Sequence, residues 1–394
     1  MTTKHRSLLG VVAAITLACG VWGSSLGLAD SERATNVEIA EQNAAVFEVE
    51  PYLFAHGTGH IAVGWRYTGN RLPTTPVRVQ TYLGNTQLNE VEAHHDGVSW
   101  SAELPVAECG FGNEVSYYLP GMSQRNVIAP IPCPDEHQPV RFSFIADAQE
   151  GPEFLEDIAK EISTFPGSAI FSGGDLVQEG AQMQDWFDYF RALQIIGGSR
   201  VTYAVIGNHE YRSDENTNYW QNFFRLKAHD AHYSTYLGGI HLMALNSNFE
   251  DDKTLVEPEL EWLKSELIKP AQWKIVMFHH SPYSKGFFDG PGAIRKEHIV
   301  LRNQFVPLFE AYGVDVVLTG HTHIFERSVK DGIQYVVAGP AGGKMGVYGA
   351  KNPYSIHSFR ERTVTHFEVN DQVLRSVTLS IHGEILDDFT VNHK

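Results

Sequence analysis

VDVVLTGHTH, residues 314–323, is a short apolar run that ends in a glycine and two histidines. The apolar half has the length and the β-branched composition of a buried strand. In an extended segment, residues i and i+2 point the same way, so His321 and His323 can bring two imidazoles to one place. The stretch therefore predicts a buried strand with a potential metal site just beyond its carboxyl end.

Similar apolar runs alternate with stretches of helical period from about residue 139 to residue 394. This alternation predicts a layered α/β domain with buried strands. We expect strands at residues 140–146, 169–172, 201–206, 240–246, 274–278 and 314–318, and helices at residues 152–163, 182–195, 258–267 and 298–312. We expect four late strands, at residues 334–338, 363–369, 373–380 and 384–391, to be antiparallel and to complete a second sheet.

Residues 46–134 follow a different pattern, in which short alternating segments are separated by Gly, Asn and Pro turns. This pattern predicts a small all-β sandwich of fibronectin type III or immunoglobulin type. Prolines at positions 130, 132 and 134 end the expected sandwich, because proline stiffens the chain and removes a hydrogen-bond donor. The polar residues 30–45 before it are interpreted as a linker.

Residues 1–29 have the pattern of an export signal, with a basic start, an apolar run from Leu8 to about Val21 and small residues before Asp30. The apolar run is shorter than the about 20 residues that span a bilayer. We therefore expect cleavage, no membrane span afterwards and a periplasmic or secreted protein, with an uncleaved anchor as the alternative. Cys109 and Cys133 then remain as a pair compatible with one disulfide in an oxidising compartment.

The composition is that of a globular protein, with 43% apolar and 20% charged residues among 394. Lys and Arg number 30 against 47 Asp and Glu, which gives a formal net charge of -17. Nucleic-acid binding is not expected, because it depends on clustered cations that neutralise phosphates. A small phosphate ester is still a possible substrate, since a metal ion can reverse the local field. The sequence leaves the oligomeric state open.

Metal-ligand side chains follow five of the expected strands. They are Asp147 with Gln149, Asp175, Asn208, His279 or His280, and His321 with His323. In open α/β sheets, ligands bind beyond the carboxyl ends of the strands, so these side chains should converge. Carboxylates, an amide oxygen and imidazoles suit Zn, Fe or Mn better than Ca. The ligands outnumber the needs of one tetrahedral ion, so we expect two divalent or trivalent ions roughly 3.5 to 4 Å apart.

Five short motifs carry these residues: Asp-x-Gln, Gly-Asp, Gly-Asn-His-Glu, His-His-x-Pro-Tyr and Gly-His-x-His-x-Phe-Glu-Arg. The set resembles the calcineurin-like metallophosphoesterase superfamily, and its last motif is similar to the signature of purple acid phosphatases. The resemblance covers roughly residues 46–390. It implies a four-layer β-sandwich flanked by helices, preceded by a fibronectin-like domain.

The resemblance also implies roles for individual residues. It assigns Asp147, Asp175 and His323 to the first ion, and Asp175, Asn208, His279 and His321 to the second, with Asp175 as the bridge. His279 is preferred to His280 because residues 276–279, VMFH, are similar to a family motif, whereas strand alternation leaves both open. His209 is implied to contact the phosphate and to protonate the leaving alcohol.

Further residues are expected around the substrate. His280 is assigned a catalytic role, and Tyr283 and Arg302 are expected to bind substrate together with Asn208 and His209. Lys285 is expected to line the same pocket wall.

Two positions depart from the family. Purple acid phosphatases carry a tyrosinate three residues after the bridging Asp, and Gln178 stands there in this chain. The charge-transfer colour should therefore be absent. Gln149 stands where much of the superfamily has a histidine, and as a weaker, neutral donor it predicts a first site of lower affinity.

The leading hypothesis is a phosphomonoesterase in which a metal-bound hydroxide attacks phosphorus and His209 helps the alcohol to leave. A phosphodiesterase with the same centre is the second, because only the pocket walls distinguish the two activities. The third is a noncatalytic secreted binding protein whose sandwich is the working part.

Overall fold

The computed structural model describes residues 47–57, 61–69, 76–106, 110, 115–133, 138–214, 217–227, 231–287, 296–349 and 351–393. The predicted export signal at residues 1–29, the predicted linker at residues 30–45 and Cys109 lie outside these residues.

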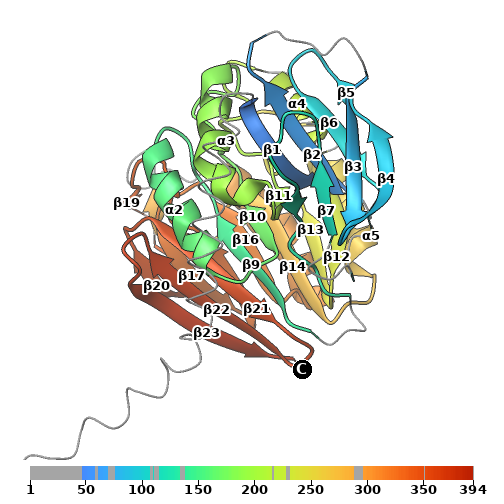
Figure 1. Ribbon diagram of the computed structural model, residues 1–394. Coiled ribbons are helices and arrows are strands. Elements are labelled where there is room, and N and C mark those ends of the chain that lie inside the picture. Colours follow the sequence, from blue (N-terminus) through green and yellow to red (C-terminus); the bar gives the residue numbers. More distant parts are fainter. Residues whose placement is uncertain are drawn as a thin grey trace, which may run out of the picture.

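Two large β-sheets form the centre of the molecule (Figure 1). The larger sheet contains, in spatial order, β23 (Ile385–Asn392), β22 (Val373–Ser380), β21 (Thr363–Val369), β9 (Val140–Ile145), β10 (Ala169–Ser172), β11 (Val201–Ala204), β1 (Phe47–Ala55), β2 (Ile61–Tyr67), β6 (Trp100–Leu104) and β5 (His94–His95). The second contains β12 (Tyr233–Leu237), β13 (Ile240–Ala244), β14 (Trp273–His280), β16 (Val316–Gly320), β18 (Ile333–Val337), β17 (Phe325–Lys330) and β20 (Ser355–Phe359).

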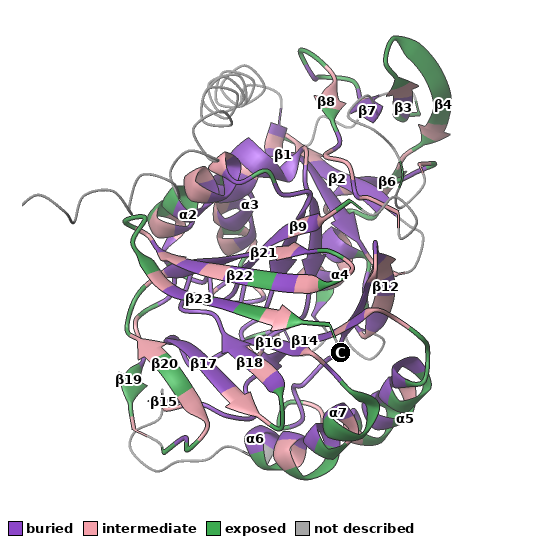
Figure 2. Cartoon of the chain, turned by 90° about the horizontal axis from the view of Figure 1, so that it is seen from below, coloured by how far each residue is buried: buried purple, intermediate pink, exposed green. Residues whose placement is uncertain are grey.

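Helices cover the outer faces of both sheets (Figure 2). The larger sheet is covered by α2 (Pro152–Thr164) and α3 (Met183–Gly197), which pack against each other. The second sheet is covered by α5 (Val256–Leu267), α6 (Lys296–Val300) and α7 (Val306–Tyr312), with a π-helical turn at Leu301–Phe305 between the last two. A short helix, α4 (Asn218–Phe224), lies beside the N-terminal strands. The four-layer architecture expected from the resemblance is confirmed.

Strand alternation explains why the second sheet is buried on both faces. In β14, Ile275 and Met277 belong to the main core between the sheets, whereas Val276 and Phe278 belong to a second core under α5 and α7. Successive side chains point to opposite faces of a sheet, so a continuous apolar run supplies both cores at once. These short apolar runs therefore identified the central strands correctly.

The N-terminal strands form two sheets, as a sandwich requires. One is the four-stranded sheet of β4 (Thr86–Glu92), β3 (Arg78–Leu83), β7 (Val115–Tyr118) and β8 (Asn126–Val127). The other continues into the larger sheet, because β1 pairs in parallel with β11 through Leu53 with Val201 and Phe54 with Thr202. The division into two domains, residues 46–134 and 139–394, stays a prediction. The backbone hydrogen bonds between β1 and β11 connect the two predicted domains.

The late strands differ in part from expectation. Strand β18 pairs in parallel with β16 inside the second sheet, so its expected antiparallel arrangement is correct only toward β17. Strands β21 to β23 are antiparallel, but they extend the larger sheet beside β9. The expectation that all four complete the second sheet is therefore wrong. Strand alternation identifies a strand but not its neighbour, because pairing is decided by contacts distant in sequence.

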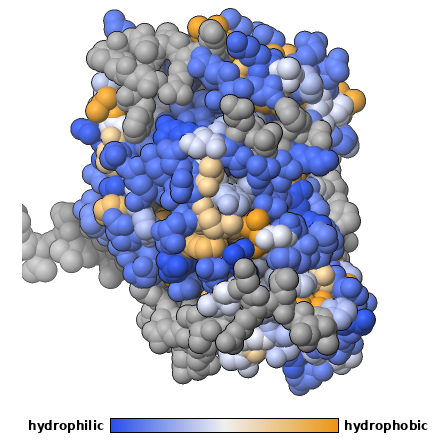
Figure 3. Space-filling model, turned by 90° about the horizontal axis from the view of Figure 1, so that it is seen from above, coloured by the Kyte–Doolittle hydropathy of each residue, from blue (hydrophilic) through white to orange (hydrophobic). Residues whose placement is uncertain are grey.

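Two further observations concern the surface and the cysteines. The face seen in Figure 3 is dominated by hydrophilic side chains, with a small group of apolar ones near its centre. Within the described part of the chain, no helix combines the length and the hydropathy that crossing a bilayer requires. Cys133 is disulfide-bonded, and its predicted partner Cys109 lies outside the described residues.

Glu50 on β1 makes the stability of this fold depend on pH. Burial raises the pKa of Glu50 to about 8, and its Oε1 is buried without a hydrogen-bond partner among the described residues. Between about pH 4.5 and pH 8 the folded protein thus holds a proton that the unfolded chain has released, so stability falls as pH rises through this window. We expect Glu50→Gln to match the parent near pH 4.5 and to be more stable by roughly 1 kcal/mol at pH 8, after discounting for partial exposure.

Thermal unfolding of both proteins across this range, with the exposed Glu92→Gln as control, measures the effect. A difference between Glu50→Gln and the parent that does not grow with pH would contradict it.

Candidate metal centre

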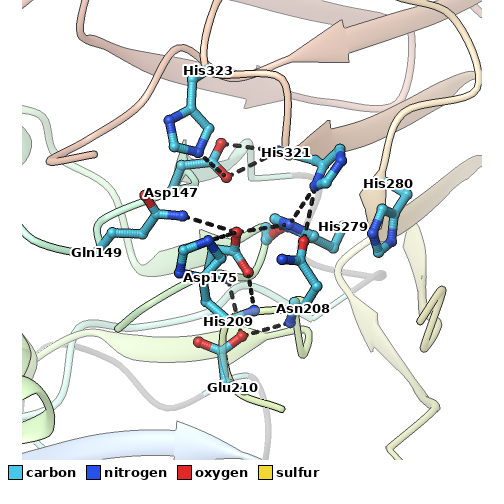
Figure 4. A network of polar contacts seen from close by, with 12 residues as sticks. Asp147, Gln149, Asp175, Asn208, His209, Glu210, His279, His280, His321 and His323 are labelled. Atoms are coloured by element: carbon cyan, nitrogen blue, oxygen red, sulfur yellow. Dashed lines mark hydrogen bonds and ion pairs between the residues drawn. The ribbon is translucent and has the colours of Figure 1, made fainter. Parts of the chain in front are cut away.

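The two sheets meet where their parallel strands end. The backbone of Ala146, just after β9, forms a parallel bridge with Pro340, which follows β18. Ala341 N donates to Ala146 O at 2.8 Å, and Gly343 N donates to Asp147 O at 2.8 Å. The loops after β9, β10, β11, β14 and β16 therefore face one another across this junction. The predicted convergence of the side chains that follow the strands is observed (Figure 4).

One group of donor atoms centres on His279. Its Nε2 lies 3.1 Å from Asp175 Oδ2 and 3.3 Å from His321 Nδ1, and His321 Nδ1 lies 2.9 Å from Asn208 Oδ1. His279 Nδ1 donates to Gly173 O at 2.8 Å, which leaves Nε2 to face the group. His279 lies at the end of β14, and the other three residues come from the loops after β10, β11 and β16. They are the four residues that the resemblance implied for the second ion.

A second group of donor atoms centres on Asp147. His323 Nε2 lies 3.5 Å from Asp147 Oδ1, and the Nδ1 of the same ring donates to Lys344 O at 2.5 Å. Ligand atoms of Asp147, Asp175 and His279 all lie within 4.8 Å of one another. Asp175 and His279 therefore both take part in each group, and the bridging role of Asp175 stays a prediction.

The backbone at the site is strained. Asp147, Gln149, Asp175, His321 and His323 all have positive φ, between 43° and 73°. Such left-handed conformations are costly for residues with a side chain and persist only where the surroundings enforce them. Gly207 shows how closely these loops pack, because a Cβ there would lie 2.2 Å from Asp175 Oδ1.

Glu210 holds the loops together and was missed by the sequence interpretation. Its Oε2 accepts hydrogen bonds from Gly207 N at 2.6 Å and Asp175 N at 3.1 Å, and its Oε1 accepts one from Leu176 N at 2.7 Å. This buried carboxylate thus ties the loop after β10 to the loop after β11. The signal was present in the Gly-Asn-His-Glu motif, but nothing in the sequence indicates that Glu210 points toward backbone amides.

The buried charges of the site are strongly coupled. Burial raises the pKa of Asp147 well above its usual value, and burial together with Asp175 raises the pKa of Glu210 to about 7. Burial opposes ionisation of Asp175 as well, but the imidazoles of His279 and His209 lower the pKa of its carboxyl below the usual value. Burial alone would lower the pKa of His279, and the Asp175 carboxylate raises it to about 9.

The donor set fits metal ions. Burial lowers the pKa of His323 to about 4, so this imidazole is neutral and able to coordinate at physiological pH. At His279 a cation would compete with the proton for Nε2, so metal binding there releases a proton. Carboxylate, imidazole and amide oxygen donors match Zn, Fe or Mn.

The remaining predicted residues of the centre lie close by. Gln149 turns its Nε2 toward Asp175 Oδ2 at 3.0 Å, so its amide nitrogen and not its oxygen faces the bridge. His209 Nδ1 donates to Gln178 O at 2.8 Å, and its Nε2 lies 3.8 Å from Asp175 Oδ2. His280 Nδ1 lies 2.9 Å from Ser247 Oγ, and its ring centroid is 4.3 Å from that of His321. This geometry favours His279 over His280 as the ligand facing Asp175.

A pocket opens onto the centre. It is lined by Gln149, Glu150, Asp175, Gln178, Asn208, His209, Arg212, His321, His323 and Lys344. Arg212 and Lys344 were not singled out from the sequence, because neither belongs to a recognisable motif.

The expected pocket wall lies elsewhere. The Arg302 guanidinium stacks 5.4 Å from the ring centroid of Tyr283, and Tyr283 packs edge-on against Tyr335 and Tyr354. Lys285 N donates to Glu326 Oε2 at 2.6 Å. Neither Tyr283, Lys285 nor Arg302 is among the described residues that line the pocket, so their substrate role stays a prediction that this geometry does not favour.

Comparison with known proteins identifies the domain. Residues 140–325, which contain all the donor residues, match the model of the calcineurin-like phosphoesterase family. The chain carries a calcineurin-like phosphoesterase domain. Purple acid phosphatase 18 of Arabidopsis thaliana is 28% identical over 169 residues, 39% of this chain and 37% of that protein. Probable purple acid phosphatase 20 of the same plant is 24% identical over 64% of each chain.

A solved structure extends the similarity of fold. Purple acid phosphatase PPD1 from yellow lupin seeds superposes with a TM-score of 0.70 at 15% identity, covering 87% of this chain and 74% of that one. The phosphoesterase fold is therefore shared across nearly the whole chain, and the relatives support the branch that resembles purple acid phosphatases. The chain nevertheless spans less than two thirds of the length of the two Arabidopsis phosphatases.

Gln178 lines the pocket that opens onto the donor residues. Its backbone carbonyl holds His209, and its Oε1 is buried without a hydrogen-bond partner among the described residues. We expect the iron-loaded protein to lack a visible charge-transfer band and Gln178→Tyr to gain one, because a phenolate at this place would reach the metal. Visible absorption of both proteins loaded with iron is the measurement. A colourless, fully loaded Gln178→Tyr protein would show that position 178 does not reach the ion.

Proposed function

We propose that the chain is an exported, metal-dependent phosphomonoesterase. The observation that carries the proposal is the shared position of Asp175, which contributes to both donor groups at the floor of an open pocket. The first ion would be held by Asp147, Asp175 and His323, and the second by Asp175, Asn208, His279 and His321. When bound, a pair of ions supplies Lewis-acid activation of water and of phosphoryl oxygens.

The residues of the chain position the substrate around this pair. Asn208 and His209 line the pocket side by side, and the Gln178 carbonyl fixes the orientation of the His209 ring so that Nε2 faces the site. His209 Nε2 can then hold or deliver a proton at the oxygen of the leaving alcohol. The disulfide at Cys133 supports an oxidising compartment and hence export, although the signal itself stays a prediction.

His209→Ala separates this proton donation from general damage to the site. We expect it to lower kcat about 100-fold or more on alkyl phosphates but much less on p-nitrophenyl phosphate, because an alkoxide needs a proton to leave and a nitrophenolate does not. Rates on both substrates give the ratio. Equal losses would argue against a general acid at this position.

One assay tests the proposed function itself. The purified protein is stripped of metal, reloaded with Zn, Mn or Fe, and assayed on p-nitrophenyl phosphate and on bis-p-nitrophenyl phosphate, with metal content measured in parallel. We expect two ions per chain and higher kcat/KM on the monoester. Preference for the bis-ester would make the chain a phosphodiesterase, and well under one ion per chain with no turnover would favour a binding protein.

A further inference from the structure

A short helix outside the pocket connects the proposed catalytic turn to the N-terminal strands. Helix α4 follows the turn that carries Asn208 and His209, and Asp214 lies between the turn and the helix. Asp214 N donates to Tyr211 O at 3.2 Å, and the Asp214 carboxylate accepts from Asn218 N at 2.6 Å at the start of the helix. The turn and the helix are thus held together by a buried aspartate.

Helix α4 is too short to be stable by its own hydrogen bonds. It has seven residues, whereas isolated helices shorter than about 12 residues are at best marginally stable in water. It is flanked by Thr217 and Arg225, whose φ angles of 49° and 57° are left-handed and costly for residues with a side chain. The stability of this helix must therefore come from the elements that it packs against.

The N-terminal strands supply such contacts at the carboxyl end of α4. Tyr52 OH, on β1, donates to Phe223 O at 2.7 Å. Ser99 Oγ, just before β6, donates to Asn222 O at 3.0 Å. The last carbonyls of a helix have no partner inside it, so these two hydroxyls satisfy groups that the helix itself cannot. The carboxyl end of α4 is thus fixed by side chains of the N-terminal strands.

A second set of contacts leads from α4 to the same turn. Phe223 is fully buried against Trp186 of α3, with ring centroids 5.3 Å apart. Trp186 Nε1 donates to Gly180 O at 2.9 Å, and Gly180 N donates to His209 O at 3.0 Å. The packing here is close, because a Cβ at Gly180 would clash with Glu210 O. A shift of α4 would therefore displace the backbone of His209.

We infer that the N-terminal strands position Asn208 and His209 through α4, and that Tyr52 is the positioning residue at this contact. The inference rests on the proposed function, because it adds a residue to the support of the same centre. Asn208 is assigned to the second ion only, so the loss of the Tyr52 hydroxyl should weaken one ion more than the other. Coupling between two sites is reciprocal, so metal bound at Asn208 should in turn stabilise α4.

The test compares Tyr52→Phe with a matched control, Tyr117→Phe. Tyr52→Phe removes one hydroxyl and keeps the ring, which stacks 4.1 Å from the ring of Phe190. Tyr117 OH, on β7, donates to Gly198 O at 2.9 Å, so it also joins the N-terminal strands to a later part of the chain, but just after α3 and not at α4. The full-length parent and both variants are titrated with Zn²⁺ by calorimetry, and backbone amide exchange is followed by mass spectrometry with and without Zn²⁺.

We expect Tyr52→Phe to bind one of two Zn²⁺ ions about tenfold less tightly, as for other groups that orient ligands, and Tyr117→Phe to bind both like the parent. The amides of Gly180 and Arg212, which both donate to His209 O, should exchange about fivefold faster in Tyr52→Phe than in Tyr117→Phe, as for the loss of one hydrogen bond. Zn²⁺ should slow exchange in α4 of the parent, and less so in Tyr52→Phe.

Two outcomes would overturn the inference. Equal effects of the two substitutions, whether both change Zn²⁺ binding or neither does, would show that Tyr52 does not position Asn208, while the metal centre itself would stand. Faster exchange without weaker Zn²⁺ binding would limit Tyr52 to a role in the fold. If the parent binds no Zn²⁺, the proposed function fails, and exchange at Gly180 and Arg212 in the metal-free proteins alone decides the inference.

Discussion

Asp175→Ala is expected to lose most of its bound metal and at least about 1000-fold of its turnover. Asp175 lies 1% exposed between the two donor groups, with Oδ2 at 3.1 Å from His279 Nε2 and at 3.0 Å from Gln149 Nε2. A single substitution therefore removes a ligand from both proposed sites. Each bound ion contributes several kcal/mol to stabilising a phosphoryl transition state, and about 4 kcal/mol already corresponds to three orders of magnitude in rate.

Metal content by elemental analysis and kcat on p-nitrophenyl phosphate measure the two effects together. Asp188→Asn on the exposed side of α3 serves as the control, because it removes a carboxylate that lies outside the site. Asp175→Asn keeps the shape of the side chain and the acceptor for His209 N, which lies 2.8 Å from Oδ1. It should fold like the parent yet bind less metal. Two ions per chain retained in Asp175→Ala would remove this residue from the centre.

Glu210→Ala should weaken both the fold and the metal centre, although Glu210 is not assigned to either ion. Its carboxylate is 1% exposed and accepts backbone hydrogen bonds from Gly207, Asp175 and Leu176. Removing it leaves three buried donors without this acceptor, at about 1 to 3 kcal/mol for each donor left unsatisfied. We expect a loss of at least about 3 kcal/mol in the free energy of unfolding. Metal affinity should fall about ten- to 100-fold, as for other groups that orient ligands.

Denaturant unfolding of the metal-free protein separates the first effect from the second. Glu210→Gln should lie between the parent and Glu210→Ala, because one amide oxygen can still accept while its NH2 group faces a backbone donor. Glu179→Ala is a suitable control, since Glu179 accepts from exposed Ser213 at 3.1 Å. Unfolding within about 0.5 kcal/mol of the parent, with unchanged metal affinity, would show that Glu210 does not hold the two loops.

The strand ends could be predicted because they obey a local rule. Apolar runs of four to eight residues identify buried strands, and polar residues directly after such runs gather at one edge of a parallel sheet. Asp147, Asp175, Asn208, His279, His321 and His323 all follow this rule, and all meet in the structure. The positive φ of Asp147, Asp175 and His323 was not predictable, because it results from the closure of loops packed against one another.

The neighbours of each strand could not be predicted in the same way. Pairing of β1 with β11 joins Leu53 to Val201, and pairing of β21 with β9 joins Phe367 to Phe142. Both pairings depend on contacts between residues far apart in the chain. The periodicity of a strand reflects only neighbouring residues, so it does not predict these contacts. For the same reason the expected substrate residues Tyr283 and Arg302 pack together away from the pocket lining, whereas Arg212 lies in it.

Local pattern thus predicted a layered α/β fold and the polar side chains that the structure brings together beyond the strand ends, because both depend on which residue type follows which strand. The three-dimensional arrangement decided which atoms meet: Glu210 with the loop amides, and Gln149 with the Asp175 carboxylate. These contacts depend on how loops from two sheets pack against each other. The burial of these side chains and the distances between them are set only when the chain has folded, so the sequence pattern does not contain them.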